Sequence, residues 1–295
     1  MKINNLFIWF RQKPRIAFLM CLPLILMVAC LIIYPFFYSI FLATLNKAET
    51  KFVGIANFLF LFKRETFWLV VQQSIFFALV AVFFKALIGF IAAHSINEIP
   101  SKGQRKWRGM LLIPWVIPPA LSTLGWWWLF EPTYSALNWI LAKLSIEAIP
   151  WLSETFWARF SIILVNIWVG APFFLIMYLA ALKSIPEDLY EAASIDGANY
   201  WQKLFFITLP MMKNIISITI LFSIIVTFAN FDIVRVLTRG GPIDTTHLFA
   251  TYAFRVGIES GDIPLGAAVS LFMFPVLAIL SFIILRNVRK RASEV

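Results

Sequence analysis

The chain has 295 residues, of which 61% are hydrophobic and only 14% are charged, and its formal net charge is +10. A soluble domain of this length needs many more polar side chains to cover its surface, so the composition excludes one and predicts a polytopic membrane protein. The excess positive charge is expected to face anionic lipid headgroups, which leaves no need for a nucleic acid partner.

Six apolar stretches are long enough to cross a bilayer, which requires about 20 mostly apolar residues. They lie at residues 16–43, 68–96, 110–130, 159–182, 214–235 and 264–285. The connections between them are short, so we expect a single membrane domain over residues 16–285. The predicted fold class is an all-α polytopic membrane protein with six transmembrane helices.

The two ends of the chain are basic. The first apolar stretch is longer than the core of a signal peptide and lacks a small-residue cleavage site, so we interpret it as a retained span. Residues 1–15 combine cations with apolar side chains, and both an interfacial helix and a frayed tail remain open. Residues 286–295 form a basic tail.

The distribution of cations predicts the orientation. Segments 1–15, 97–110, 183–213 and 286–295 together hold 15 Lys and Arg in 70 residues, whereas the alternate connections hold 9 in 81 residues. Positive charge is retained on the cytoplasmic side of membranes. Both termini and the segment 183–213 are therefore predicted to be cytoplasmic.

The third apolar stretch contains Pro114, Pro118 and Pro119, which remove backbone donors. We expect them to kink or break the helix. Three tryptophans follow at positions 126–128, and because consecutive helical residues point in different directions, at least one should face the bundle interior. An indole at the membrane interface is the alternative interpretation.

Polar side chains inside apolar spans are costly and usually face the interior, either toward a substrate or in hydrogen bonds between helices. Lys85 is unusual because it lies well inside the second span. It is suited to an anionic substrate, but snorkelling or pairing with a carboxylate of another subunit also stays open. The candidates for a substrate pathway are Gln72, Lys85, Trp128, Asn166, Trp168, Asn230 and Asp232.

The chain offers no pattern for a catalytic, metal or nucleotide site. Cys21 and Cys30 lie on different turns of the first span, and the two histidines, His94 and His247, are too sparse for a cluster. No Gly-x-x-x-x-Gly-Lys-[Ser/Thr] pattern occurs. We therefore expect no bound cofactor and no enzymatic activity in this chain.

Residues 184–213 form a polar segment between two apolar spans. Ser184 and Glu187 have the spacing of a capping box, with Pro186 in the first helical turn. Gly197 is expected to adopt positive φ, and a second short helix over residues 198–206 should run to Leu209-Pro210. The segment thus predicts a pair of short helices that a partner can contact.

The same segment resembles the EAA loop of ATP-binding-cassette (ABC) importer permeases. That loop has the pattern Glu-Ala-Ala-x-x-x-Gly followed by Ile-x-Leu-Pro. The resemblance implies the type I importer permease fold, with this loop as a coupling helix that docks on a separate ATPase. The coupling residues would be Glu191, Ala192, Ala193, Asp196, Gly197, Leu209 and Pro210.

Two further stretches, Phe52–Phe58 and Leu237-Thr238-x-Gly-Gly-Pro242, resemble carbohydrate permeases of the maltose type, specifically the first of their two paired subunits. The resemblance implies a bacterial inner-membrane subunit that moves a carbohydrate, expected to be an oligosaccharide, and an acidic one if Lys85 contacts it. The implied partners are a homologous second permease, an ATPase dimer that holds ATP and Mg, and an extracytoplasmic solute-binding protein.

Two alternatives belong to other classes. A self-sufficient secondary transporter or channel is expected to carry intramembrane carboxylates for ion coupling, and only Asp232, near the end of a span, comes close. An intramembrane enzyme needs a cluster of His, Asp or Glu at membrane depth. Neither alternative accounts for the segment 184–213.

Overall fold

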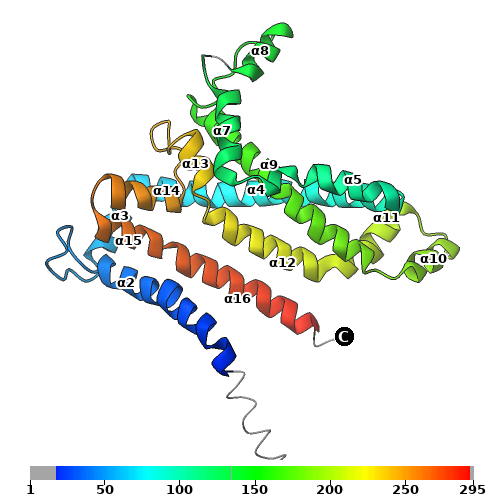
Figure 1. The fold of residues 1–295 in the computed structure, drawn as a ribbon, viewed down its shortest axis with the longest axis horizontal. Coiled ribbons are helices and arrows are strands. Elements are labelled where there is room, and N and C mark those ends of the chain that lie inside the picture. The colour runs from blue at the N-terminus through cyan, green and yellow to red at the C-terminus, as the bar shows by residue number, and fades with distance from the viewer. Residues whose placement is uncertain (1–17, 134, 293–295) are drawn as a thin grey trace, which may run out of the picture.

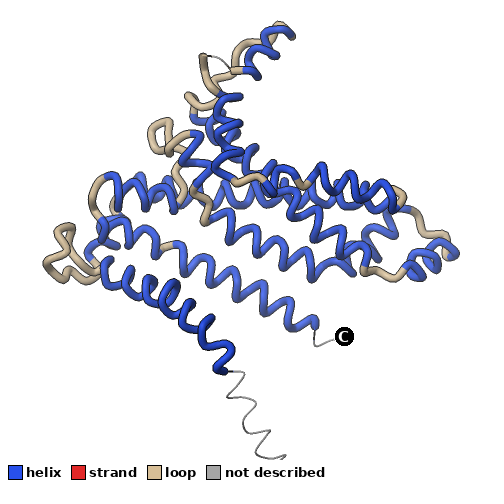
Figure 2. Tube along the Cα trace, in the orientation of Figure 1, coloured by secondary structure: helices blue, strands red, loops and turns tan. Residues whose placement is uncertain are grey.

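The computed structural model describes residues 18–133 and 135–292. These residues form helices joined by loops, and within them the only β pairing is an isolated bridge between Leu45 and Phe52 (Figure 2). The expected all-α class is confirmed. The predicted interfacial segment 1–15 lies outside the described residues.

The elements are numbered in chain order, with π-helical turns marked η. They are η1 (Ala29–Ile33), α2 (Tyr34–Ala43), α3 (Ala56–Phe62), α4 (Glu65–Glu98), α5 (Ser101–Leu111), α6 (Ile113–Val116), α7 (Pro119–Phe130), α8 (Ala136–Lys143), α9 (Thr155–Lys183), α10 (Glu187–Ile195), α11 (Tyr200–Lys203), η2 (Leu204–Thr208), α12 (Leu209–Phe228), α13 (Asp232–Leu237), α14 (Phe249–Phe254), η3 (Arg255–Glu259), α15 (Ile263–Leu271) and α16 (Met273–Ala292).

Five helical stretches among the described residues are long and apolar enough to cross a membrane. They are Phe18–Ala43, Glu65–Glu98, Thr155–Lys183, Tyr200–Leu237 and Ile263–Ile284. These correspond to five of the six predicted spans. The sixth predicted span, residues 110–130, is not among them, because the break expected there divides it into shorter helices. Whether this stretch crosses the membrane stays a prediction.

The break in the third predicted span lies at Ile117, whose ψ of 131° is extended rather than helical. Pro118 follows as the N-cap of α7, and Pro119 is its first residue. Because a proline disfavours the helical conformation of the residue before it, two consecutive prolines end α6 and start a new helix. The chain thereby changes direction, and α7 and α8 project away from the bundle (Figure 1).

The core of the bundle is the pair α4 and α9, against which α12 packs. Apolar side chains from all three helices form one buried cluster, including Ala93, Phe174, Leu175, Tyr178 and Met212. Because α4 and α9 pack against each other along their length, these two elements form the frame to which the shorter segments attach. Figure 1 shows them running along the long axis of the molecule.

The two ends of this frame carry different segments. In Figure 1, α10 and α11 lie at one end, whereas α3 and α14 lie at the other. Which end faces the cytoplasm stays a prediction from the distribution of cations.

Candidate functional site

The segment 184–213, which we call the coupling segment, folds into two short helices joined by a tight turn. Gly197 has φ of +77°, as expected, and its N–H bonds to Ser194 O at 3.1 Å. The N–H of Ala198 bonds to Ala193 O at 2.9 Å, which closes the turn as in a Schellman motif. This turn directs α11 back toward the membrane bundle.

The predicted capping box at Ser184 is wrong. The N-cap of α10 is Pro186, and no side chain caps it. Ser184 instead ends α9, and its hydroxyl donates to Ala181 O at 2.7 Å, so it is not available to the next helix. The capping box of the segment belongs to the second helix, where Asn199 and Gln202 bond each other's backbone N–H.

The predicted end of the second helix is also wrong. Instead of stopping near Phe206, the helix passes through η2 into α12, and Pro210 is the second residue of α12. The N–H of Leu209 bonds to Leu204 O, five residues earlier. The wider π turn accommodates the helix at Pro210 without a break. The coupling segment is therefore continuous with a membrane-spanning helix.

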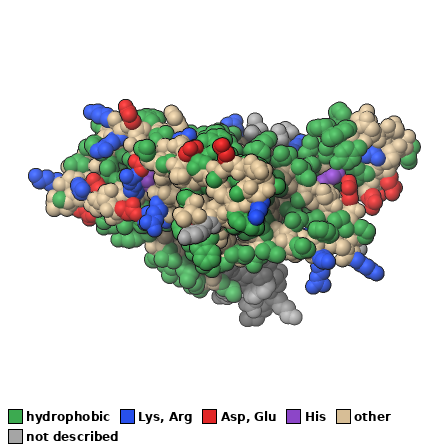
Figure 3. Space-filling view, turned by 90° about the horizontal axis from the view of Figure 1, so that it is seen from above, with side chains coloured by type: hydrophobic (Ala, Val, Ile, Leu, Met, Phe, Trp, Pro, Cys, Tyr) green, Lys and Arg blue, Asp and Glu red, His purple; other side chains and the backbone are tan. Residues whose placement is uncertain are grey.

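Hydrogen bonds within the coupling segment hold its short helices together, and its exposed surface is acidic and partly apolar. Tyr190 and Thr208 share a hydrogen bond of 2.9 Å between their hydroxyls, and Lys203 Nζ donates to Ser194 Oγ at 2.6 Å. Figure 3 shows acidic side chains gathered at this end of the molecule. The exposed acidic residues of α10 and its turn are Glu187, Asp188, Glu191 and Asp196.

Of the predicted coupling residues, Glu191, Ala192, Asp196 and Gly197 are exposed and Ala193 is half-buried. A hollow of about 360 Å³ lies between α10 and η2, lined by Ala193, Asp196, Gly197, Ala198, Gln202, Lys203, Phe206 and Ile207. Leu209 and Pro210 begin α12 and do not line it. The exposed side of the segment therefore presents carboxylates and a shallow hollow.

A second feature is a cavity of about 200 Å³ lined mainly by α9 and α12, into which α4 contributes Lys85. Lys85 is 4% exposed, and its Nζ donates to Thr227 Oγ1 at 2.9 Å. No carboxylate of the described residues lies within ion-pair distance of this amine. The cavity thus contains a buried amine whose hydrogen-bond partner, among the residues that the structure describes, is a neutral hydroxyl.

Two asparagines complete the polar wall of this cavity. The side-chain oxygens of Asn166 and Asn230 are buried and have no hydrogen-bond partner among the described residues. Buried polar atoms are normally satisfied, so two unpaired acceptors beside one buried amine indicate a place for a polar ligand. The aromatic side chains of Trp115, Phe173 and Phe222 also line the cavity.

Sequence reasoning identified part of this cavity. Among the predicted pathway residues, Lys85, Asn166 and Asn230 line it, whereas Gln72, Trp128, Trp168 and Asp232 do not. Trp128 is 74% exposed. Trp168 packs against Trp126, with ring centroids 5.6 Å apart. The cavity residues that were missed include Trp115, Gly170, Phe173 and Phe222; of these, Gly170 follows Asn166 by one helical turn, and that spacing was a usable signal.

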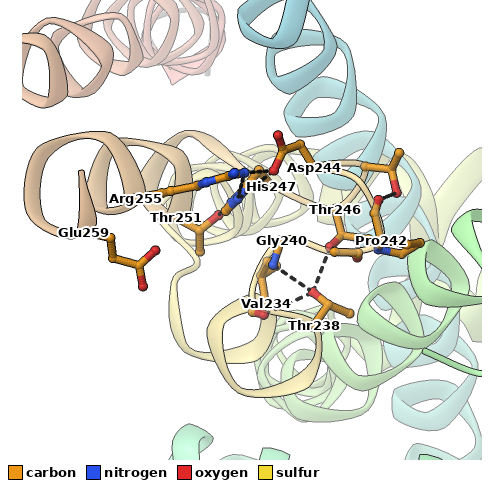
Figure 4. A network of polar contacts seen from close by, with 12 residues as sticks. Val234, Thr238, Gly240, Pro242, Asp244, Thr246, His247, Thr251, Arg255 and Glu259 are labelled. Atoms are coloured by element: carbon orange, nitrogen blue, oxygen red, sulfur yellow. Dashed lines mark hydrogen bonds and ion pairs between the residues drawn. The ribbon is translucent and has the colours of Figure 1, made fainter. Parts of the chain in front are cut away.

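The loop between α13 and α14, together with η3, forms a polar network at the end of the molecule opposite the coupling segment (Figure 4). Thr238 and Thr246 share a hydroxyl hydrogen bond of 2.7 Å, and Thr246 donates to Gly241 O at 2.6 Å. Arg255 pairs with Asp244. The Gly-Gly-Pro stretch is therefore held in one conformation by side chains that flank it.

His247 lies at the centre of this network and is neutral at pH 7. Burial lowers the pKa of its imidazole to about 4, with Glu259 raising and Arg235 lowering it by smaller amounts. His247 Nε2 lies 3.6 Å from Asp244 Oδ1, but a neutral ring forms no ion pair there. Arg255 is consequently the ionic partner of Asp244.

The helices long enough to span a membrane surround a cavity with polar side chains, and the short helices α10 and α11 lie at one end of the bundle. This arrangement indicates a membrane transport subunit. The chain belongs to the family of binding-protein-dependent transport system inner membrane components, whose model matches residues 85–294. This membership confirms the class expected from the resemblance, the permease of an ABC importer.

Several relatives in this family match nearly the whole chain. The trehalose/maltose transport system permease protein MalF of Thermococcus litoralis is 34% identical over 277 residues, which cover 92% of each chain. The sulfoquinovosyl glycerol transport system permease protein SmoG of Agrobacterium fabrum is 31% identical and covers 96% of this chain and 94% of its own length.

Solved structures show the same fold. A subunit of a bacterial ABC transporter involved in the import of the acidic polysaccharide alginate superposes with a TM-score of 0.83 at 25% identity, covering 96% of this chain and 98% of that one. A permease of the MetNI methionine ABC transporter superposes with a TM-score of 0.54 at 18% identity, which bears on the fold alone. The fold is therefore that of ABC importer permeases.

Proposed function

We propose that this chain is the translocation subunit of an ATP-driven importer that moves an acidic oligosaccharide across the bacterial inner membrane. The buried amine of Lys85 in the cavity carries the proposal. An ammonium group without a counter-ion is costly inside a membrane protein. A carboxylate on the substrate would supply that counter-ion while the substrate occupies the cavity.

The other walls of the cavity suit a sugar. The unpaired oxygens of Asn166 and Asn230 can accept hydrogen bonds from hydroxyl groups, and Phe173 and Phe222, whose centroids are 5.2 Å apart, offer apolar faces to a pyranose ring. The alginate importer among the structural neighbours and the sugar permeases among the relatives support this substrate class.

Other subunits of the importer would hydrolyse ATP and deliver the substrate to this chain. The chain contains no phosphate-binding loop, so ATP and Mg are assigned to an ATPase dimer that docks on the coupling segment. A solute-binding protein would deliver the substrate to the loops at the opposite end, and one structural neighbour was solved with its periplasmic protein bound. The chain itself contributes translocation, not catalysis.

A second, homologous permease is the remaining partner. The most apolar window of the first span, Phe18–Ala43, is 0% buried within this chain. Tyr34, Phe37 and Phe41 are among its exposed side chains. This exposed apolar face, on a helix whose other side packs on α15, is suited to a neighbouring subunit, and a paired permease would also close the open side of the cavity.

The test compares two substrates in proteoliposomes that contain the complete importer and its binding protein. One is a labelled uronate oligosaccharide, and the other is the same oligosaccharide with its carboxyl groups reduced to alcohols. Lys85→Met should lower uptake of the acidic substrate at least about tenfold, equivalent to about 1.4 kcal/mol, and affect the neutral one little.

The control is Lys143→Met, which removes a cation from α8 outside the cavity. Equal effects of Lys85→Met on both substrates would refute the acidic substrate. Uptake by this chain alone, without ATPase or binding protein, would instead support the secondary transporter or channel and refute the importer.

A further inference from the structure

The helix α4 makes polar contacts with three functional regions along its length. Near the first end, Gln73 Nε2 donates to Asp244 O at 3.2 Å in the network around His247. In the middle, Lys85 donates to Thr227 in the cavity. At the other end, His94 bonds to the coupling segment through Tyr200. One element therefore contacts both ends of the molecule and the cavity.

The contact between Tyr200 and His94 is specific. The Tyr200 hydroxyl lies 2.8 Å from His94 Nε2, and the two rings meet edge to face with centroids 5.6 Å apart. His94 Nδ1 is buried without a hydrogen-bond partner among the described residues, so Nε2 makes the polar contacts of this ring, and Glu98 Oε1 also lies 3.4 Å from it. Phe90 stacks on the imidazole at 6.1 Å and fixes its plane.

The helix between this contact and the cavity is continuous. α4 is helical from Glu65 to Glu98 with no proline, and it packs along α9. Lys85 and His94 are nine residues apart, a rise of about 14 Å along the axis. Helices kink at identifiable features such as prolines and π turns, none of which occurs in α4. A displacement of His94 is therefore carried to Lys85.

The coupling segment is also joined to the cavity by a second route. α11 continues through η2 into α12, which carries Thr227. The two partners of the Lys85–Thr227 hydrogen bond thus lie on two helices, and both of these helices are connected to α11. The connection to α12 is covalent, whereas α4, which also packs against α12, meets α11 through Tyr200 and His94.

We infer that Tyr200 and His94 are positioning residues that make α4 move with α12 when the ATPase displaces the coupling segment. With their hydrogen bond intact, Lys85 and Thr227 move together and the cavity keeps its shape around the substrate. Without it, α12 moves while α4 lags, and the cavity is distorted during the transition. This inference rests on the proposed function and adds that the contact between Tyr200 and His94 links the coupling segment to α4 during transport.

The experiment measures the number of substrate molecules transported per ATP hydrolysed by the reconstituted importer. Tyr200→Phe and His94→Leu should each lower this ratio about tenfold while ATP hydrolysis continues. The double variant should be no worse than either single one, because both remove the same bond. His94→Gln keeps a side-chain nitrogen within reach of Tyr200 and should restore most of the ratio.

Ser217→Ala removes a hydroxyl of α12 that bonds within its own helix, to Lys213 O at 2.8 Å, and should leave the ratio unchanged. A wild-type ratio in Tyr200→Phe, or additive losses in the double variant, would overturn the inference. Thermal stability close to wild type in all variants separates a lost linkage from misfolding. If the proposed function were wrong, wild-type importer would already fail to accumulate the acidic oligosaccharide, a result distinct from a loss confined to these variants.

Discussion

Gly170 on α9 leaves the space that the Lys85 side chain occupies. A Cβ atom built on Gly170 would lie 2.7 Å from Cε and 3.1 Å from Nζ of Lys85. Real Cβ atoms do not approach other atoms so closely, so any larger residue at this position displaces the lysine. The position of the amine in the cavity thus depends on a glycine on a neighbouring helix.

Replacing this glycine should impair transport of the acidic substrate. Gly170→Ala pushes Lys85 away from Thr227, and we expect uptake of a uronate oligosaccharide to fall about tenfold, with overpacking costing about 1–3 kcal/mol of stability. Gly125→Ala is the matched control, because no atom lies within 4 Å of a Cβ built there. Equal uptake by the two variants would show that the space at Gly170 has no role in transport.

Removing the unpaired, buried side-chain oxygen of Asn166 should lower uptake without lowering thermal stability. Asn166→Leu deletes an acceptor that has no partner in the structure, so thermal stability should stay constant or rise, while uptake falls about tenfold. Asn138 provides the contrast, since its side chain bonds to Ile149 and Trp151. Asn138→Leu should lower the melting temperature. A loss of stability in Asn166→Leu with normal uptake would contradict the role of Asn166 in substrate binding.

The turn of the coupling segment requires positive φ at Gly197. Gly197→Pro cannot adopt φ of +77°, because the proline ring fixes φ near −65°. The variant should insert into the membrane but lose coupling between ATP hydrolysis and uptake, measured as transport per ATP. Gly197→Asn, which tolerates left-handed φ, should retain most of the coupling. Full transport by the proline variant would count against the role of this segment.

The network around His247 should weaken as the pH falls. Burial lowers the pKa of His247 from 6.5 to about 4, so the unfolded chain binds a proton that the folded chain excludes. Its contribution to stability is complete above pH 6.5 and declines as the pH falls from 6.5 toward 4, by at most about 1.4 kcal/mol per pH unit. Thermal unfolding of the purified protein between pH 7.5 and 4.5 measures this slope.

His247→Gln serves as the control for the pH experiment, because glutamine keeps a polar side chain near Thr251 but does not titrate. The melting temperature of the wild type should fall more steeply with acid than that of the variant. Parallel curves would mean that His247 titrates equally in the folded and unfolded chain.

Local sequence chemistry predicted the coupling segment in part. Gly197 adopts the positive φ expected of it, because only the residue type decides whether that conformation is accessible without strain. The cap at Ser184 and the end at Pro210 were predicted wrongly. In both places the outcome depended on a neighbouring turn, since Ser184 bonds backward into α9 and a π turn carries the helix past Pro210.

The cavity residues, too, were predicted from the sequence only in part. Lys85, Asn166 and Asn230 were recognisable as costly polar groups in apolar spans, whereas Gln72 and Asp232 looked equivalent and lie exposed, away from the cavity. Which face of a helix points inward depends on how that helix packs. The pattern of α4 gave little help, because its apolar residues lie on all sides.

The amino-acid sequence by itself determined that this chain is a helical membrane protein, and it predicted which segment contacts the ATPase, because span length, charge distribution and turn residues act within a few positions of each other. Only the tertiary structure decided that Lys85 meets Thr227 and Gly170, and that Tyr200 meets His94. These contacts join residues on different helices, and their geometry follows from the packing of α4 against α9 and α12, which no local pattern encodes.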